Sequence, residues 1–271
     1  MKKHGSVLLL TAMFFVGLSV LLYPTLSNCW NSRVQSRAIQ NYEQVLQELD
    51  AEACAQQFEA ADLYNARLRQ LSFPLLQTNR AQGYTELLDV SGSGVMGYLS
   101  IEKIGVEMPI YHGTSEPVLN IAAGHLEGSS LPVGGVGTHA VLSAHRGLPS
   151  ARLFTDLDRL ETGDSFTITV LNRVLTYEVD QILIVEPDET EPLRIVEGED
   201  FCTLFTCTPY GINSHRLLVR GRRAETASAR PALLVANEAC RIDPMLVAPA
   251  AAAPMLLILL IVLLVKYRKK S

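Results

Sequence analysis

The chain has 271 residues, of which 48% are hydrophobic and 19% are charged, and its formal net charge is −5. This apolar content excludes an intrinsically disordered chain, and 18 Gly and 13 Pro are too few for a collagen-like repeat. Nucleic-acid binding would normally require a basic excess, which is absent. The length allows one or two domains of ordinary size.

Basic residues at both ends of the chain flank an acidic interior. Residues 1–3 include two lysines and residues 266–271 include four basic residues, and neither end contains an acid. The rest of the chain has 17 Lys and Arg against 28 Asp and Glu, a net charge of about −11. Because each basic end adjoins an apolar run, the pattern predicts two membrane segments.

The first apolar run, residues 6–24, contains no charged residue. As a helix it would reach about 30 Å, the thickness of the hydrocarbon core of a bilayer. A cleaved signal peptide is the alternative, but its apolar region typically has about 7–15 residues before a small-x-small cleavage site. This run is longer and continues into Tyr-Pro-Thr-Leu at 23–26. We therefore predict that residues 1–25 form a retained transmembrane anchor.

The second apolar run covers residues 245–265, and Pro249 and Pro254 weaken only its first half. A cell-wall sorting tail would follow an LPxTG-type pentapeptide, and none precedes this run. We predict a second transmembrane helix here, followed by a basic cytoplasmic tail at 266–271. The positive-inside rule then places both termini in the cytoplasm and residues 26–244 outside the cell, with the lipid bilayer as a partner.

Five cysteines at irregular spacings form neither a regular disulfide framework nor a paired zinc motif. They are Cys29, Cys54, Cys202, Cys207 and Cys240. An unpaired thiol outside the cell is exposed to oxidation, so an odd number suggests that a thiol is needed. How the other four are paired stays open.

Apolar residues recur at intervals of three and four between Asn31 and Leu71, which predicts two amphipathic helices with a break near Asp50. Together they form a helical arm over residues 26–71 that packs on the body or spaces it from the membrane. Residues 72–94 are predicted to be a loop that ends in Ser-Gly-Ser-Gly.

From Val95 the pattern changes to short β-like runs separated by Gly and Pro. The runs are 95–101, 106–113, 139–144, 165–171, 174–187, 201–207 and 215–221. Short strands at this spacing predict one small barrel or sandwich over residues 95–223, so the fold class is mainly β. The Ala-rich stretch 224–244 is predicted to be a linker to the second membrane helix.

The strand at 201–207 distinguishes two of the cysteines. Side chains alternate along a strand, so Cys207 and Cys202 face opposite sides. Cys207 also closes the strand, just before a turn that contains Pro209 and Gly211, and reactive groups are often presented at such ends. If the chain returns as an antiparallel hairpin, Arg216 lies beside Cys207, where a cation favours thiolate and can stabilise an oxyanion. A surface Arg beside a buried Cys is the alternative.

A thiol nucleophile also needs a proton partner, and His145 is the leading candidate because it follows a strand-like run and opens a loop. His215 is the rival, but it neighbours Arg216 and therefore points the other way in an extended strand. His112 and His125 lie in turn-like contexts and are expected to be structural.

Three separated blocks of this sequence resemble one enzyme family. TLFTCTPYGINSHRLLVRG at 203–221 is similar to the TLxTC…R signature of the sortases, the cysteine transpeptidases of Gram-positive bacteria, and SAHRGLPSARLF at 143–154 resembles their histidine block. The segments 94–114 and 121–135 are similar to the pilin-polymerising class C sortases. The resemblance covers about residues 84–223 in the family's order, and two membrane segments with a helical arm also fit class C.

The resemblance implies that Cys207 is the nucleophile, His145 the proton donor and acceptor, and Arg216 the residue that stabilises the oxyanion and positions the substrate. The implied fold is the sortase closed β-barrel with the site in a groove on its face. No metal or organic cofactor is implied.

The residues Ser143, Leu204 and Thr206, within the same motifs, are expected to bind substrate. The substrates implied are pilin subunits or surface proteins that bear an LPxTG-like signal, which is cleaved between Thr and Gly through a thioacyl enzyme and passed to a pilin lysine. A housekeeping sortase that uses a cell-wall precursor, a cysteine protease that uses water and a non-catalytic scaffold are the alternatives.

One departure from class C concerns the lid that usually covers the groove with an Asp-Pro-aromatic motif. Counting back about ten residues from Tyr84 gives Phe73, Pro74 and Leu75. The Asp is absent and an aliphatic residue replaces the aromatic one. We predict a lid held by apolar contact alone and therefore looser than is usual, with an ordinary linker loop as the alternative.

Overall fold

The computed structural model describes residues 2–71, 75, 83–224, 254–258 and 261–262. The chain divides into two compact units, residues 1–30 with 232–271, and residues 31–231. The second unit contains the β-barrel and the candidate functional residues.

The N-terminal apolar run is helical, as expected for a membrane anchor. Helix α1, Lys2–Glu48, continues through Pro24, so the predicted anchor and the first predicted helix of the arm are one helix. Its apolar part is long enough to cross a membrane. The predicted second span at 245–265 lies mostly outside the described residues. Only 254–258 and 261–262 are described there, both as helix, and a second transmembrane helix is not shown.

The break predicted near Asp50 is confirmed. Helix α2, Ala51–Arg69, begins after Asp50, whose carboxylate accepts the backbone N–H of Ala53 at 2.7 Å and so caps the helix. The apolar stripes of both helices are buried, including Tyr42 on α1 and Phe58 on α2. Tyr42 donates its hydroxyl to the carbonyl of Met96, and this bond ties α1 to the barrel.

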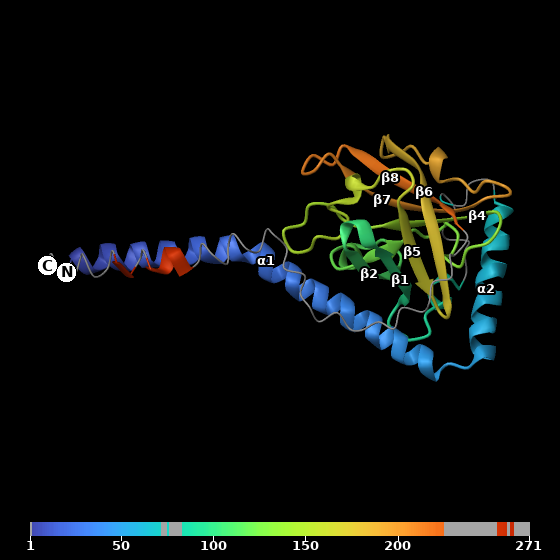
Figure 1. Ribbon diagram of the computed structural model, residues 1–271, viewed down its shortest axis with the longest axis horizontal. Coiled ribbons are helices and arrows are strands. Elements are labelled where there is room, and N and C mark those ends of the chain that lie inside the picture. Colours follow the sequence, from blue (N-terminus) through green and yellow to red (C-terminus); the bar gives the residue numbers. More distant parts are fainter. Residues whose placement is uncertain (1, 72–74, 76–82, 225–253, 259–260, 263–271) are drawn as a thin grey trace. The chain divides into compact units, whose positions relative to one another are not determined.

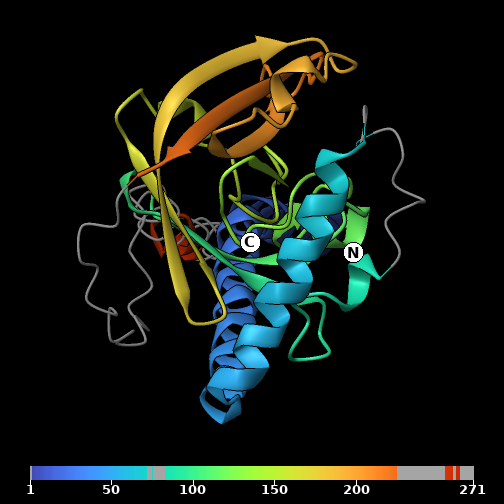
Figure 2. The same ribbon diagram turned by 90° about the vertical axis from the view of Figure 1, so that its right-hand side faces the viewer.

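Eight strands form a closed barrel in the order β1-β2-β3-β4-β7-β8-β6-β5, with α2 along its side (Figures 1 and 2). This confirms the mainly β, closed-barrel fold class. The strands are β1 Val95–Ile101, β2 Val106–His112, β3 Ala123–His125, β4 Thr138–Ser143, β5 Ser165–Val170, β6 Arg173–Val185, β7 Asp200–Thr208 and β8 His215–Arg223. Short helical turns lie between them: η3 Tyr84–Glu86, η4 Glu102–Ile104, α3 Glu116–Leu119, η5 Leu157–Arg159 and η6 Glu191–Leu193.

The barrel core packs closely at β8. Gly221 lies in this strand, and a Cβ there would come within 2.7 Å of the Phe166 ring and 2.8 Å of the Tyr177 Cβ. Both aromatic rings are buried and stacked, with centroids 5.6 Å apart. The missing side chain of Gly221 is therefore what lets the two rings fill this part of the core.

Most neighbouring strands are antiparallel, but β2 and β3 are parallel, and so are β4 and β7. Their register places Ala140 opposite Cys202 and Ser143 opposite Phe205. Both strands therefore run toward the same edge of the barrel, and the residues that follow them emerge there together.

Candidate active site

Cys207 lies near the end of β7, directly across from Arg216 on β8. This is the antiparallel register that the sequence predicts. The two cysteines of β7 differ as expected: Cys202 is fully buried in the core, where burial raises the pKa of its thiol, whereas Cys207 is partly exposed. Only the latter is placed to meet a substrate.

The Arg216 guanidinium is held at the turn between β7 and β8. Its Nη1 donates to the carbonyl oxygens of Asn213 at 3.2 Å and His215 at 3.1 Å. Within the part of the chain that the structure describes, no carboxylate forms an ion pair with it. Its positive charge is therefore available to an incoming carbonyl oxygen that becomes negative.

His145 follows β4 by two residues, just as Cys207 follows Phe205 by two residues on β7. Extending the register of Ser143 and Phe205 sets His145 opposite Cys207, on the same face of the two strands. Two bonds hold the strand ends together at this point: the Ala144 N–H donates to the Phe205 carbonyl at 3.4 Å, and the Thr206 hydroxyl donates to the Ala144 carbonyl at 2.8 Å.

The loop after His145 is fixed by residues that the sequence reasoning did not single out. Arg146 forms an ion pair with Asp158 at 2.5 Å and donates to the Thr208 hydroxyl at 3.2 Å. Gly147 has φ +79°, and a Cβ there would lie 2.7 Å from the Tyr210 ring. Any larger residue would push the two loops apart. The histidine loop and the turn after Cys207 are thus locked to each other.

The three predicted substrate-binding residues are all buried. Leu204 is 0% and Thr206 1% exposed, and both alternate with Cys207 and so face the barrel interior. Ser143 shares the face of His145 but is only 5% exposed. This burial places Leu204 and Thr206 away from the surface and favours a role in supporting the strand ends.

The other histidines have structural surroundings. His125 is fully buried, with Nδ1 2.8 Å from the Tyr84 hydroxyl and Nε2 2.8 Å from the Ser130 carbonyl. The ring nitrogens of His112 contact backbone carbonyls. His215 lies 3.3 Å from Glu186 on the rim of the barrel. The choice of His145 as the proton partner stays a prediction.

A pocket of about 520 Å³ lies between the end of α2, the start of β4 and the β6–β7 loop, defined here as residues 186–199. Leu75 of the predicted lid lines this pocket together with Leu71 and Leu193. Phe73 and Pro74 lie outside the described residues. The lid therefore stays a prediction.

The described residues were compared with the ligand sets that hold metal ions. Across 2–71, 83–224 and the short described stretches beyond them, no group of three or more His, Cys, Asp or Glu could hold a metal ion. The donors that the site does bring together are one thiol, one imidazole and one guanidinium, which suit acyl transfer.

The family model of the sortase domain matches residues 99–224, which include Cys207, His145 and Arg216. A crystal structure of sortase C1 from Streptococcus agalactiae is 47% identical, covers 70% of this chain and 98% of that chain, and superposes with a TM-score of 0.64. The chain belongs to the sortase family. Sortase C from Streptococcus pneumoniae is 45% identical over 70% of this chain and 97% of that chain, with a TM-score of 0.63.

The curated sortases are more distant. Sortase D of Bacillus subtilis is 31% identical over 130 residues, which are 47% of this chain and 63% of that protein. Sortase A of Streptococcus agalactiae is 30% identical over 117 residues, 42% of this chain and 47% of that protein. The chain thus spans about half to two thirds of these curated relatives, and its solved neighbours are class C sortases.

Proposed function

We propose that this chain is a membrane-anchored cysteine transpeptidase of class C, which cleaves an LPxTG-like signal between Thr and Gly and joins the acyl part to a pilin lysine. The observation that carries the proposal is the pairing of Cys207 with Arg216 across β7 and β8. His145 emerges at the same edge from the neighbouring parallel strand.

In the first half-reaction His145 takes the thiol proton, and the Cys207 sulfur attacks the Thr carbonyl carbon. Negative charge moves to the carbonyl oxygen, where the Arg216 guanidinium stabilises it. The bond from carbon to the Gly nitrogen then breaks, and His145 returns the proton to the departing amine. The products are a thioester on Cys207 and a free Gly amine.

In the second half-reaction a lysine ε-amine attacks the thioester carbon. His145 accepts the proton that the amine loses, an amide bond forms, and the bond from carbon to sulfur breaks to release the Cys207 thiolate. The partly exposed position of Cys207 supports this step, because a large acceptor must reach the thioester.

The membrane topology belongs to the same proposal. Helix α1 is apolar enough to span a bilayer and would anchor the enzyme near membrane-held substrates. A second span at 245–265, with both termini cytoplasmic and the barrel outside the cell, follows from the apolar run and the basic ends.

The lid is proposed as a loose apolar cover. Leu75→Ala removes its described contact in the pocket beside the β6–β7 loop and should increase the alkylation rate of Cys207 by a bulky maleimide. Val196→Ala, an exposed apolar position in the same loop that does not line the pocket, is the matched control. Equal alkylation rates in wild type and Leu75→Ala would argue against a lid.

Mass spectrometry tests the function directly. The full chain in detergent is incubated with an LPxTG-bearing pilin domain, beside Cys207→Ala. A thioacyl adduct on Cys207 that passes to a pilin lysine is the expected result. Resolution by water alone would indicate a protease, resolution by cell-wall-type amines a housekeeping sortase, and the absence of any adduct would contradict the mechanism.

A further inference from the structure

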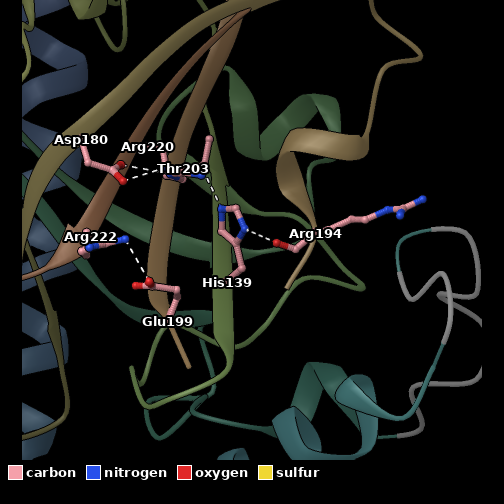
Figure 3. Close-up of polar contacts among 7 residues, drawn as sticks. All are labelled: His139, Asp180, Arg194, Glu199, Thr203, Arg220 and Arg222. Carbon is pink, nitrogen blue, oxygen red and sulfur yellow. Dashed lines mark hydrogen bonds and ion pairs between the residues drawn. The ribbon is translucent and has the colours of Figure 1, made fainter. Parts of the chain in front are cut away.

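His139, near the start of β4, uses both ring nitrogens in hydrogen bonds (Figure 3). Its Nδ1 is 2.8 Å from the carbonyl oxygen of Arg194 in the β6–β7 loop, and its Nε2 is 2.7 Å from the Thr203 hydroxyl on β7. Because a carbonyl can only accept, Nδ1 carries the hydrogen and Nε2 accepts from Thr203. One imidazole therefore links the β6–β7 loop to strands β4 and β7, which we call the β4–β7 floor.

The surroundings of His139 keep the ring neutral. The side chain is almost fully buried, and burial, with a smaller effect from Arg220, lowers its pKa to about 4. Arg220 itself is held by two bonds to Asp180, at 3.0 and 2.7 Å, and lies 4.1 Å over the Phe201 ring (Figure 3 shows the ion pair). The Phe201 ring in turn meets His139 edge to face at 5.6 Å.

Before Glu199 the loop's own backbone bonds are local: Leu193 N–H donates to Thr190 and Arg194 N–H to Glu191, which shapes the turn. The carbonyl of Glu199, at the end of the loop, accepts from the N–H groups of Gly137 and Thr138 and attaches that end to β4. At its end, Arg222 pairs with Glu199 at 2.9 Å, next to β7 (Figure 3). The bond from His139 to Arg194 fixes the loop five residues before that end.

This contact lies on the same face as the candidate catalytic residues. Side chains alternate along a strand, so residues an even number apart share a face. His139 and His145 are six residues apart on β4 and its extension, and Thr203 and Cys207 are four apart on β7, so each pair lies on one face. Four strand residues span about 13 Å. An extended LPxT segment that runs along β7 with its Thr carbonyl at Cys207 has about this length, so its Leu end would reach the level of Thr203.

The wall at this level is formed by the β6–β7 loop. Leu193, Ile195 and Thr190 of the loop line the pocket together with Val136 and His139. The lining mixes polar residues with aliphatic ones, and its Leu and Ile side chains suit the aliphatic end of a sorting signal.

We propose that His139 is a positioning residue that holds the β6–β7 loop against the β4–β7 floor, so that the loop forms a fixed wall for the aliphatic end of the sorting signal. This inference rests on the proposed function for its substrate, but the attachment of the loop can be tested without it.

Two pairs of variants of the full chain test the two hydrogen bonds of His139 separately. His139→Asn keeps an amide N–H near the position of Nδ1, whereas His139→Gln moves the amide toward the position of Nε2. Thr203→Ser keeps the hydroxyl and Thr203→Val removes it. We expect His139→Gln, which loses the bond to the loop, to raise the KM for an LPxTG peptide about tenfold, as for one lost hydrogen bond, with little change in kcat. His139→Asn and Thr203→Val both lose the bond at Nε2 but keep a donor to Arg194, so they should show the same, smaller rise, and Thr203→Ser should stay near wild type.

The alkylation rate of Cys207 by iodoacetamide should be the same in all four variants, because a small reagent does not use the loop. His125→Asn is the matched control: it also alters a buried, doubly bonded histidine, but on β3, and should leave the KM unchanged. A wild-type KM in His139→Gln, or an equal rise in His125→Asn, would overturn the proposal.

Amide hydrogen exchange separates the inference from the proposed function. His139→Gln should increase exchange at Leu193 and Arg194 but not at β7, whether or not the chain acylates a peptide. Unchanged exchange would refute the attachment of the loop. If wild type forms no thioacyl adduct, the proposed function fails, and the exchange result still decides the role of His139.

Discussion

Replacing Cys207 with alanine is expected to lower kcat/KM for cleavage of an LPxTG peptide by at least about 10³-fold, because no other group can form the thioester. The partly exposed thiol lies opposite Arg216 at the end of β7. Peptide cleavage by the full chain in detergent, followed by chromatography, measures the loss.

Cys202→Ala is the matched control, since it removes a thiol from the same strand five residues earlier. Cys202 is fully buried on the opposite side of β7, and burial raises its thiol pKa, so it cannot act as the nucleophile. This variant should keep its activity at a temperature where it stays folded. Equal losses in the two variants would show that the strand, rather than the Cys207 thiol, is what the reaction needs.

The hairpin of Cys207 and Arg216 was predictable because local rules decide it. Strand alternation separates Cys207 from Cys202, and a short Pro- and Gly-containing turn leaves few possible registers. The seven β-like runs became strands for the same reason. Strand β3 was not predicted, because three residues are too few to show a period.

The supports of the site depend on contacts between distant segments, which periodicity does not reveal. Arg146 reaches Thr208 from a different loop, and Gly147 is required only because Tyr210 packs against it. His139 falls in the same class, since its partners Arg194 and Thr203 lie more than 50 residues away. The continuity of α1 through Pro24 was missed because a helix can pass a proline when its surroundings allow it.

Acidification from pH 7 to pH 5 is expected to lower the free energy of unfolding by about 4 kcal/mol, about 2 kcal/mol for each of two buried histidines. Burial is the main cause that lowers the pKa of both His125 and His139 from 6.5 to about 4. Below pH 6.5 the unfolded chain therefore binds protons that the folded chain does not, so stability falls as the pH falls, and the loss levels off below about pH 4.

Neighbouring charges change this effect only in part. Arg220 lowers and Asp180 raises the pKa of His139, and His112 lowers that of His125. Burial raises the carboxyl pKa of Glu107 and Asp200, so these groups favour the folded state as they take up protons at lower pH. The window from pH 6.5 to pH 5 therefore isolates the histidines best.

Denaturant unfolding at several pH values, with NMR titration of the histidine rings, measures both parts of this prediction. The two rings should stay neutral down to about pH 4. His139→Gln should flatten the slope of stability against pH by about half, because it removes one of the two groups. A stability that is constant from pH 7 to pH 5 would mean that the two rings are solvated, and the attachment of the β6–β7 loop through a neutral His139 would lose its basis.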